Sequence, residues 1–338
     1  MQKRVGLKEL ARRLKVDVST VSRALRDDPR VKPDTRKAVQ ALAQRLDYRP
    51  NAAARALRVG QSGRVAVLLS PPQQRFASPI FLELLSTLDQ DLRDTGRTLA
   101  VFAARTRDEE AEIVRQIIDE GLADALVLGR TRAGDPRVRF LLERGAPFVT
   151  MGKTDWPDRH PWVEIDYAHA GRIALGALAE TAAGPLHVLA APEGLNFADN
   201  YVAGALAEAR ALGLSPPQVW RIEMTEAAGE ATAAEILARA PRPALACIQD
   251  SLAFGAYRAA AQAGCVVGRD LTVFGGQNFP GSEHMAPPLS TFSTEDAAIA
   301  RLLSAVMLRR LARDGSEGPC ETHLVRPEPL PRQSHFLA

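Results

Sequence analysis

A short stretch near the start of the chain collects side chains that suit hydrogen bonding to a polyanion. Its hydroxyl and cationic residues are Ser19, Thr20, Ser22, Arg23 and Arg26. Such groups donate to phosphate oxygens, and an arginine can also donate two hydrogen bonds to a guanine edge. Residues 1–60 hold 16 Lys and Arg against 6 Asp and Glu, whereas the remaining residues hold 27 against 34. A basic head on an acidic body is typical of a nucleic-acid-binding module joined to a second domain, although a solvated basic surface gives the same counts.

The sequence lacks the spacings that common catalytic and cofactor sites require. It contains no Gly-x-Ser-x-Gly elbow, no Walker loop and no Gly-x-Gly-x-x-Gly turn. Cys247, Cys265 and Cys320 are odd in number and widely spaced, so we expect three buried thiols rather than disulfides or zinc ligands. The six histidines lack metal-ligand spacing, and we expect them on loops or helix surfaces; they are His160, His169, His187, His284, His323 and His335. We therefore expect no catalysis, no cofactor and no metal site.

Three short amphipathic helices are predicted before residue 50. The first has an apolar stripe at i, i+3, i+4 and i+7, formed by Leu7, Leu10, Ala11 and Leu14. The second follows Asp17 as N-cap and runs to Leu25, and the third begins at Pro33, which suits a first helical position. Two helices separated by a few residues fit a helix-turn-helix whose second helix enters the major groove. An ordinary three-helix bundle without a DNA role fits the spacing equally well.

From Arg64 onward, apolar runs alternate with helical stretches, as in parallel α/β sheets. The predicted strands are Val65–Leu69, Leu99–Ala103, Ala125–Leu128, Phe148–Met151, Leu186–Ala190, Leu245–Ile248 and Leu271–Phe274. The helices between them include Phe81–Asp94, Glu109–Glu120, Ala170–Thr181 and Tyr201–Ala211. This alternation predicts either one large doubly wound sheet or two sheets. No apolar run reaches the roughly 20 residues of a membrane span and no signal peptide precedes the head, so we expect a cytoplasmic protein without membrane contact.

The residues from Leu7 to Leu25 belong to a longer joint pattern. It continues through Arg30-Val31, Thr35-Arg36, Tyr48-Arg49-Pro50-Asn51 and Ala52–Leu57. With Thr20-Val21-Ser22-Arg23 at its centre, this pattern resembles the lactose/galactose repressor family of bacterial regulators. Segments of the body fall where similar family segments occur: Phe76–Phe81, Asp166–Gly171, Gln249–Asp250 and Pro287–Thr291.

The resemblance implies an N-terminal all-α helix-turn-helix head and an α/β regulatory domain of the type I periplasmic-binding-protein-like class, with two parallel-sheet subdomains. The head would take residues 1–48, a hinge helix or linker 49–62, and the ligand-binding and dimerisation domain 63–332. Within that domain, the first subdomain would hold about 63–165 and 293–321, and the second about 166–292 and 322–332. The three crossovers are expected near Ile165, Leu289 and Glu321.

The same resemblance assigns DNA-contacting roles. Val18, Ser19 and Arg23 match base-reading positions, and Arg23 should matter most because a guanidinium–guanine pair discriminates by about 1–3 kcal/mol. Phosphate contacts are assigned to Leu7 through its backbone, Thr20, Ser22, Arg26, Thr35 and Tyr48. Minor-groove or hinge positions are Asn51, Ala54, Arg55, Leu57 and Arg58. Leu57 matches the leucine that the family wedges into a central base step, although simple helix packing would also suit it.

Two head residues depart from the family pattern. Lys15 occupies a turn position that usually holds glycine, so we expect a positive φ there at some cost in local stability. Asp17 replaces a serine that commonly caps the helix and touches phosphate. Aspartate caps well but repels phosphate, which makes that one phosphate contact doubtful.

Effector-binding residues are also assigned by position. They are Phe76, Ser78, Lys153, Asp166, Tyr201, Gln249, Asp250 and Gln277. An apolar platform with amide and carboxylate groups suits a polyhydroxylated ring, so a sugar or glycoside is expected. Tyr201 stands where the family usually has a ligand-clamping arginine, and Gln277 where it has an aspartate, which leaves the ligand class only loosely implied.

These observations predict a homodimeric transcription regulator that binds a pseudo-palindromic double-stranded operator. Of the possible regulators, a repressor is the first choice. A small-molecule effector would close the cleft between the subdomains and alter the hinge spacing, with either sign of response. Two alternatives without a DNA role stay open: an exported sugar-binding protein, which would need a signal peptide, and an α/β enzyme, which turnover of a bound sugar would reveal.

Overall fold

The computed structural model describes residues 6–25, 27–46, 48, 62–69, 79–312 and 320–336 of the chain. The chain divides into two compact units, Met1–Gly63 and Arg64–Ala338. We describe each unit by itself. Among the helices of the described residues, none has the length and apolar character to cross a membrane.

The first unit contains the three predicted helices. They are α1 (Leu7–Leu14), α2 (Val18–Ala24) and α3 (Pro33–Arg45), and they close one small core around Leu10, Val21 and Val39, which are all fully buried. The Asp17 carboxylate caps α2 by accepting a hydrogen bond from the Ser19 amide at 2.7 Å. Pro33 occupies the start of α3, where its missing N–H costs nothing. The sequence prediction of these three helices is confirmed.

Lys15 ends α1 in the left-handed region, with φ 51° and ψ 41°, as its position in the turn predicted. A side chain in this conformation costs about 1 kcal/mol relative to glycine. We expect Lys15→Gly to raise the free energy of unfolding of the head by about that amount in thermal melts of the full-length chain. Lys8→Gly, at an exposed right-handed position inside the same helix, should instead lower it by about 1 kcal/mol. An unchanged or lower stability of Lys15→Gly would contradict the strain argument.

The second unit contains two parallel sheets. A six-stranded sheet has the order β11-β5-β4-β3-β1-β2, and a four-stranded sheet has the order β7-β6-β8-β9. The first comprises β1 (Arg64–Leu69), β2 (Thr98–Ala103), β3 (Ala125–Leu128), β4 (Phe148–Met151), β5 (Trp162–Ile165) and β11 (Thr322–Val325). The second comprises β6 (Leu186–Ala190), β7 (Gln218–Arg221), β8 (Ala244–Cys247) and β9 (Thr272–Phe274). Two sheets, rather than one large sheet, are therefore present.

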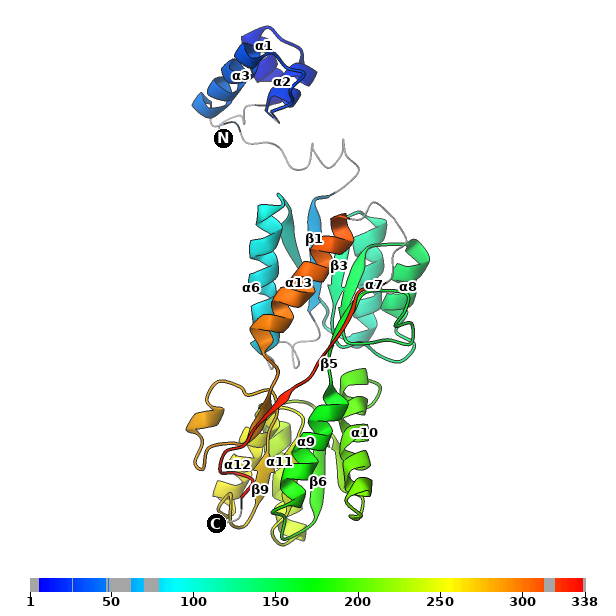
Figure 1. Cartoon of the computed structure of the whole chain (residues 1–338), viewed down its shortest axis with the longest axis vertical. Helices are drawn as coiled ribbons and strands as arrows, with labels where there is room; N and C mark the ends of the chain where they lie inside the picture. Colours follow the sequence, from blue (N-terminus) through cyan, green and yellow to red (C-terminus); the bar gives the residue numbers. More distant parts are fainter. Residues whose placement is uncertain are drawn as a thin grey trace. The chain divides into compact units, whose positions relative to one another are not determined.

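Helices cover both faces of each sheet, which gives two lobes (Figure 1). The six-strand lobe carries α6 (Pro79–Asp94), α7 (Arg107–Asp119), α8 (Pro136–Arg144) and α13 (Asp296–Ala312). The four-strand lobe carries α9 (Tyr167–Ala179), α10 (Asn196–Ala211), α11 (Glu226–Arg239), α12 (Asp250–Gln262) and the short 3-10 helix Ser282–His284. Side chains of β1 alternate between two cores: Val65 and Val67 pack with α6, whereas Ala66 and Leu68 pack with α7 and α8. This alternation explains why the strands of the sheet read as continuous apolar runs.

The chain crosses between the lobes near the carboxyl end of β5 and again near a small antiparallel pair, β10 (Thr291–Ser293) with β12 (Glu328–Leu330). The sequence prediction assigned residues from about 322 to 332 to the second subdomain, with a crossover near Glu321, and β11 shifts this boundary by a few residues. β11 pairs in parallel with β5, with His323 opposite Val163, so it belongs to the six-strand lobe. The third crossover between the lobes therefore follows Val325. The edge position of β11 leaves its side chains alternately exposed and half-buried, which gives no apolar run to recognise.

Two expectations about reactive side chains need correction. Cys247 is buried on β8, but Cys265 and Cys320 are half-exposed, because one follows the end of α12 and the other precedes an edge strand. Three of the six histidines are buried: His160 and His335 lie in loops, as expected, whereas His187 lies on the strand β6. Each is hydrogen-bonded to a neighbour, so these rings serve packing.

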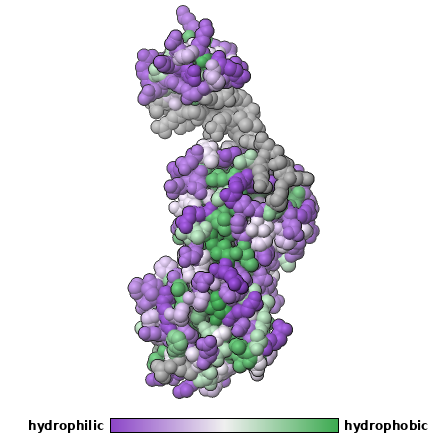
Figure 2. Space-filling model, viewed as in Figure 1, coloured by the Kyte–Doolittle hydropathy of each residue, from purple (hydrophilic) through white to green (hydrophobic). Residues whose placement is uncertain are grey.

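One face of the six-strand lobe exposes apolar side chains. Figure 2 shows them gathered over α13 and beside α6. Leu82 on α6 is 58% exposed, and Leu85, Leu302 and Leu308 are only partly buried against the core. An apolar helix pair of this kind suits contact with another protein surface.

Candidate functional site

The exposed face of α2 presents the three side chains that were assigned to base contacts. Ser19 and Arg23 lie one helical turn apart and are exposed, and Val18 beside them is 36% exposed. The opposite face of α2 packs Val21 and Ala24 into the core of the head. The helix is therefore anchored on one side and offers an apolar group, a hydroxyl and a guanidinium on the other.

The residues assigned to phosphate contacts lie around this helix with differing exposure. Leu7, Thr20, Thr35 and Tyr48 are half-buried, and Ser22 is 8% exposed. Burial raises the pKa of the Tyr48 hydroxyl, so it remains a neutral donor at pH 7. Arg26 and the hinge positions Asn51, Ala54, Arg55, Leu57 and Arg58 lie outside the described residues.

Two carboxylates border α2. Hydrogen bonds from Ser19 lower the pKa of Asp17, which fixes this carboxylate as the ionised cap of the helix. Asp28 accepts two hydrogen bonds from the Arg30 guanidinium, at 3.0 and 2.8 Å, and this pairing holds the pKa of Asp28 well below its usual range. Arg30 is thus engaged within the head, whereas Arg23 lies exposed on the same face of α2 as Ser19.

The second unit has a cavity between its two lobes, at the carboxyl ends of strands from both sheets. It encloses about 890 Å³, including the space open to solvent at its mouth. Its apolar and aromatic walls include Leu68, Leu69, Ile80, Phe81, Met151, Ile165, Tyr167, Phe197 and Met224. Its polar lining includes Arg130, Thr131, Glu164, Asn196, Gln249 and Gln277. Ligands of parallel α/β domains bind in this position, outside the carboxyl ends of the strands.

Two of the residues assigned to effector binding line this cavity, and they are hydrogen-bonded to each other. Gln249 Nε2 donates to Gln277 Oε1 at 3.1 Å, and Gln277 Nε2 donates to the Tyr167 hydroxyl at 2.5 Å. Ser251 completes the chain by donating to Gln249 Oε1 at 3.0 Å. These hydrogen bonds orient the two amides, and the Tyr167 hydroxyl accepts from Gln277 through its oxygen.

The other assigned effector residues lie elsewhere. Lys153 Nζ stands 4.9 Å from the centre of the Trp162 ring, and Asp166 caps α9 by accepting from the His169 amide at 2.9 Å. Tyr201 is fully buried against Phe292, and burial raises the pKa of its hydroxyl well above the usual range. None of these three lines the cavity. Phe76 and Ser78 lie outside the described residues.

Asp250 is a buried organiser of the loop that follows β9. Its Oδ1 accepts from Gly276 N at 2.6 Å and Thr291 Oγ1 at 2.8 Å, and its Oδ2 accepts from Phe279 N at 2.7 Å and Ser282 Oγ at 2.5 Å. Burial raises the pKa of Asp250 to about 6, although these four donors oppose the change. Asp250 is fully buried and does not line the cavity. Its carboxylate is therefore satisfied within the four-strand lobe.

Replacing Asp250 by asparagine should destabilise the second unit. Each carboxylate oxygen receives one backbone N–H, so either orientation of an amide would place its NH2 against a donor. We expect Asp250→Asn to lower the free energy of unfolding by about 2–3 kcal/mol, measured by urea denaturation. The exposed Asp94 at the end of α6 provides the control, since Asp94→Asn should change the free energy of unfolding by less than about 0.5 kcal/mol. Equal stability of the two variants would refute the organising role of Asp250.

Two charged residues of the cavity were not assigned from the sequence. Arg130 follows β3 and has a φ of 53°, and burial lowers the pKa of its guanidinium. Glu164 lies on β5, is 5% exposed, and accepts from Lys153 N at 2.6 Å and Asn200 Nδ2 at 3.1 Å. Burial raises the pKa of Glu164 despite these hydrogen bonds. Their places at the ends of strands were the signal that could have identified both residues.

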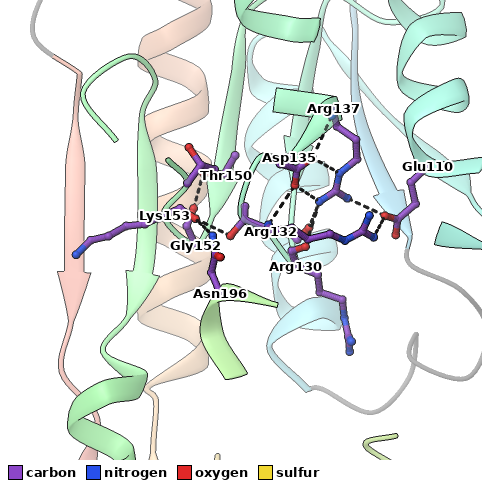
Figure 3. Close-up of polar contacts among 12 residues, drawn as sticks. Glu110, Arg130, Arg132, Asp135, Arg137, Thr150, Gly152, Lys153 and Asn196 are labelled. Carbon is purple, nitrogen blue, oxygen red and sulfur yellow. Dashed lines mark hydrogen bonds and ion pairs between the residues drawn. The ribbon is translucent and has the colours of Figure 1, made fainter. Parts of the chain in front are cut away.

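A buried ion cluster holds the loop that carries Arg130 (Figure 3). Arg137 is 2% exposed and pairs with Asp135 at 2.7 Å and with Glu110 at 3.3 Å, and Arg132 also pairs with Glu110. Arg137 Nη2 donates to the carbonyls of Gly129 and Arg130 at 3.2 and 3.1 Å. The Arg130 side chain points away from the cluster (Figure 3). The cluster thus fixes the backbone of the loop from which the Arg130 guanidinium reaches the cavity.

Comparisons with known proteins match both units. A family profile described as "Bacterial regulatory proteins, lacI family" matches residues 6–51, and one described as "Periplasmic binding protein-like domain" matches residues 165–335. "HTH-type transcriptional regulator AglR" of Rhizobium meliloti is 32% identical over 275 residues, which cover 80% of this chain and 76% of that protein. "HTH-type transcriptional regulator CelR" of Thermobifida fusca is 26% identical over 333 residues, which cover 96% and 98%.

Two solved structures share the fold. A "transcriptional regulator CelR-cellobiose complex" has a TM-score of 0.72 at 23% identity and covers 98% of this chain and 100% of that one. A structure described as the lac repressor dimer bound to operator and the anti-inducer ONPF has a TM-score of 0.85 at 18% identity and covers 99% and 100%. The expected fold, an all-α helix-turn-helix head with a periplasmic-binding-protein-like domain, is confirmed.

Proposed function

The chain belongs to the lacI family of bacterial regulatory proteins, and from that premise we propose that α2 reads an operator while the cavity between the lobes senses a saccharide. Its relatives AglR and CelR are transcriptional regulators, and PurR of Salmonella is a transcriptional repressor, so this chain is a regulator and not an enzyme. The observation that carries the proposal is the exposed face of α2, with Ser19 and Arg23 one turn apart.

The proposed DNA contact follows from the chemistry of that face. The Arg23 guanidinium can donate two parallel hydrogen bonds to guanine O6 and N7, Ser19 can donate one, and Val18 can contact a thymine methyl. The half-buried hydroxyls of Thr20, Thr35 and Tyr48 would bind phosphates and set the register of the head on the duplex.

The proposed effector is a neutral saccharide. Phe81, Phe197 and the methionine side chains of the cavity supply apolar surface for the CH face of a sugar ring, and oriented amides and carboxylate supply partners for its hydroxyls. Among the residues that the structure describes, the lining offers one cation and one anion, Arg130 and Glu164, whose charges offset each other. A relative of the same fold is described in complex with cellobiose, which supports this ligand class.

We further propose that the chain acts in the cytoplasm as a homodimer on a pseudo-palindromic operator. The apolar face of α6 and α13 would form the dimer contact, in keeping with the dimer described for the lac repressor. Two heads are needed because one short recognition helix offers a small footprint on DNA. A ligand that favours one arrangement of the lobes would then shift operator affinity by a population shift.

A titration of operator affinity tests the proposal. The full-length protein is bound to the duplex that it selects from genomic fragments, and the affinity is followed by fluorescence anisotropy as neutral saccharides, cellobiose among them, are added. We expect at least one saccharide to change the Kd by about fivefold to 150-fold. Failure of every saccharide would overturn the effector class, and binding without sequence preference would overturn the regulatory function.

A further inference from the structure

The start of α10 makes a set of hydrogen bonds from the four-strand lobe to the six-strand lobe. Asn196 Nδ2 donates to the Lys153 carbonyl at 2.9 Å, and Asn200 Nδ2 donates to Glu164 Oε1 at 3.1 Å. Asn196 N also donates to the Thr131 carbonyl at 3.0 Å. The two asparagines lie one turn apart and therefore share a face of the helix. We call these four residues, Asn196, Asn200, Lys153 and Glu164, the latch.

The receiving side of the latch is held in one geometry. Lys153 N donates to Glu164 Oε2 at 2.6 Å, and Thr131 Oγ1 donates to the Lys153 carbonyl at 2.7 Å. Gly152 before it has a φ of 114°, and a Cβ there would lie 2.6 Å from Thr131 Oγ1. Thr150, Gly152, Lys153 and Asn196 converge at this point (Figure 3). The turn therefore favours glycine, and the Lys153 carbonyl and the Glu164 carboxylate each have a hydrogen bond from within their own lobe.

The donating helix is fixed to its own lobe. α10 packs so closely on α9 that a Cβ added to Gly171 would lie 2.1 Å from the Tyr201 carbonyl oxygen. A Cβ added to Gly204 would lie 2.0 Å from the Ala168 carbonyl oxygen. α10 cannot slide on α9 without loss of this contact, so α10 moves with the four-strand lobe, and a movement of that lobe away from the six-strand lobe would break the latch hydrogen bonds.

Glu164 belongs to the latch and to the cavity lining at once. Each of its carboxylate oxygens already accepts one hydrogen bond, Oε2 within its own lobe and Oε1 from α10, and each retains a further lone pair. Asn196 and Phe197, from the same turn of α10, also line the cavity. We infer that Glu164 couples ligand to lobe position: a ligand hydroxyl donates to the carboxylate while Asn200 holds it, so ligand and latch stabilise the same arrangement. The ligand half of this inference rests on the proposed saccharide effector, whereas the latch half does not.

A charge swap within the latch tests the inference without any ligand. Asn200→Asp places a second carboxylate against Glu164 and should open the latch by repulsion. Adding Glu164→Gln should close it again, because the glutamine amide can donate to the new carboxylate while its oxygen still accepts from Lys153 N. Ala203→Asp adds the same charge at an exposed position of α10 and serves as the matched control. The readout is amide hydrogen exchange of the full-length protein over residues 150–165 and 194–204.

We expect exchange in both segments to rise about tenfold in Asn200→Asp and to return to the wild-type rate in the double variant. Ala203→Asp should exchange like wild type. Wild-type exchange in Asn200→Asp, or no recovery in the double variant, would overturn the latch. For the ligand half, calorimetry with neutral disaccharides, cellobiose among them, should show binding that Asn200→Asp weakens about tenfold. If wild type and Asn200→Asp bind the disaccharide equally well, the coupling is overturned, although the latch itself is not. If wild type binds no disaccharide, the proposed effector class is overturned instead.

Discussion

Arg23→Ala should cost the regulator most of its operator specificity. The guanidinium is exposed on α2, one turn from Ser19. Under the proposed function it would donate two hydrogen bonds to one guanine. Each such contact discriminates by about 1–3 kcal/mol, so a dimer with two heads should lose about 2–6 kcal/mol on its preferred duplex. Affinity for scrambled DNA should change little. Competition binding of preferred and scrambled duplexes at one salt concentration measures both effects.

Two further variants separate the readout of bases from simple attraction to phosphate. Arg23→Lys keeps the charge but lacks the planar fork, so it should recover only part of the affinity that Arg23→Ala loses on the preferred duplex. Lys32→Ala removes an exposed charge next to the start of α3 and should weaken all sequences about equally. If Arg23→Ala and Lys32→Ala have the same effect on both duplexes, the role of Arg23 in reading bases is wrong.

Arg137→Ala should strongly destabilise the second unit. It would remove the cation shared by Asp135 and Glu110, which are 0% and 1% exposed, and would leave Glu110 with Arg132 alone. The carbonyls of Gly129 and Arg130 would also lose the hydrogen bonds from Arg137. Removing one partner of a buried ion pair costs about 3–5 kcal/mol. The loop that carries Arg130 should loosen as well, so affinity for the effector should fall along with stability. Urea denaturation of the full-length chain measures the change in unfolding free energy.

An exposed ion pair between the same two helices, α7 and α8, provides the control. Arg144 pairs with Asp119 at 2.9 Å, and the two side chains are 54% and 44% exposed. Such a pair contributes at most about 1 kcal/mol, so Arg144→Ala should be nearly neutral. Comparable stabilities of Arg137→Ala and Arg144→Ala would mean that the cluster does not hold the loop.

The elements with strong local signals could be predicted from the sequence. Asp17 and Pro33 mark the starts of α2 and α3, and the continuous apolar runs at β3 and β4 give these strands with their observed bounds. β5 and β7 were missed. Glu164 interrupts the apolar run of β5, and β7 has only half-buried or exposed side chains. Their strand state depends on pairing with neighbours that lie far away in the sequence.

The cavity was predicted less well because its polar groups are selected by long-range contacts. Asp250 has the residue type of a ligand contact, but its four donors come from positions 26 to 41 residues further along the chain. No local spacing reveals that its oxygens are already used. Conversely, Glu164 stands within an apolar strand and becomes a cavity residue only where the two lobes meet.

Selection of DNA from a random duplex library by the full-length protein tests the central claim most directly. Bound duplexes are recovered at moderate ionic strength, with and without neutral saccharides, and are sequenced. We expect an enriched site with two inverted half-sites, and we expect Arg23→Ala to lose the preference at one guanine in each half. Recovered sequences that match the starting library under both conditions would contradict the claim that this chain reads an operator.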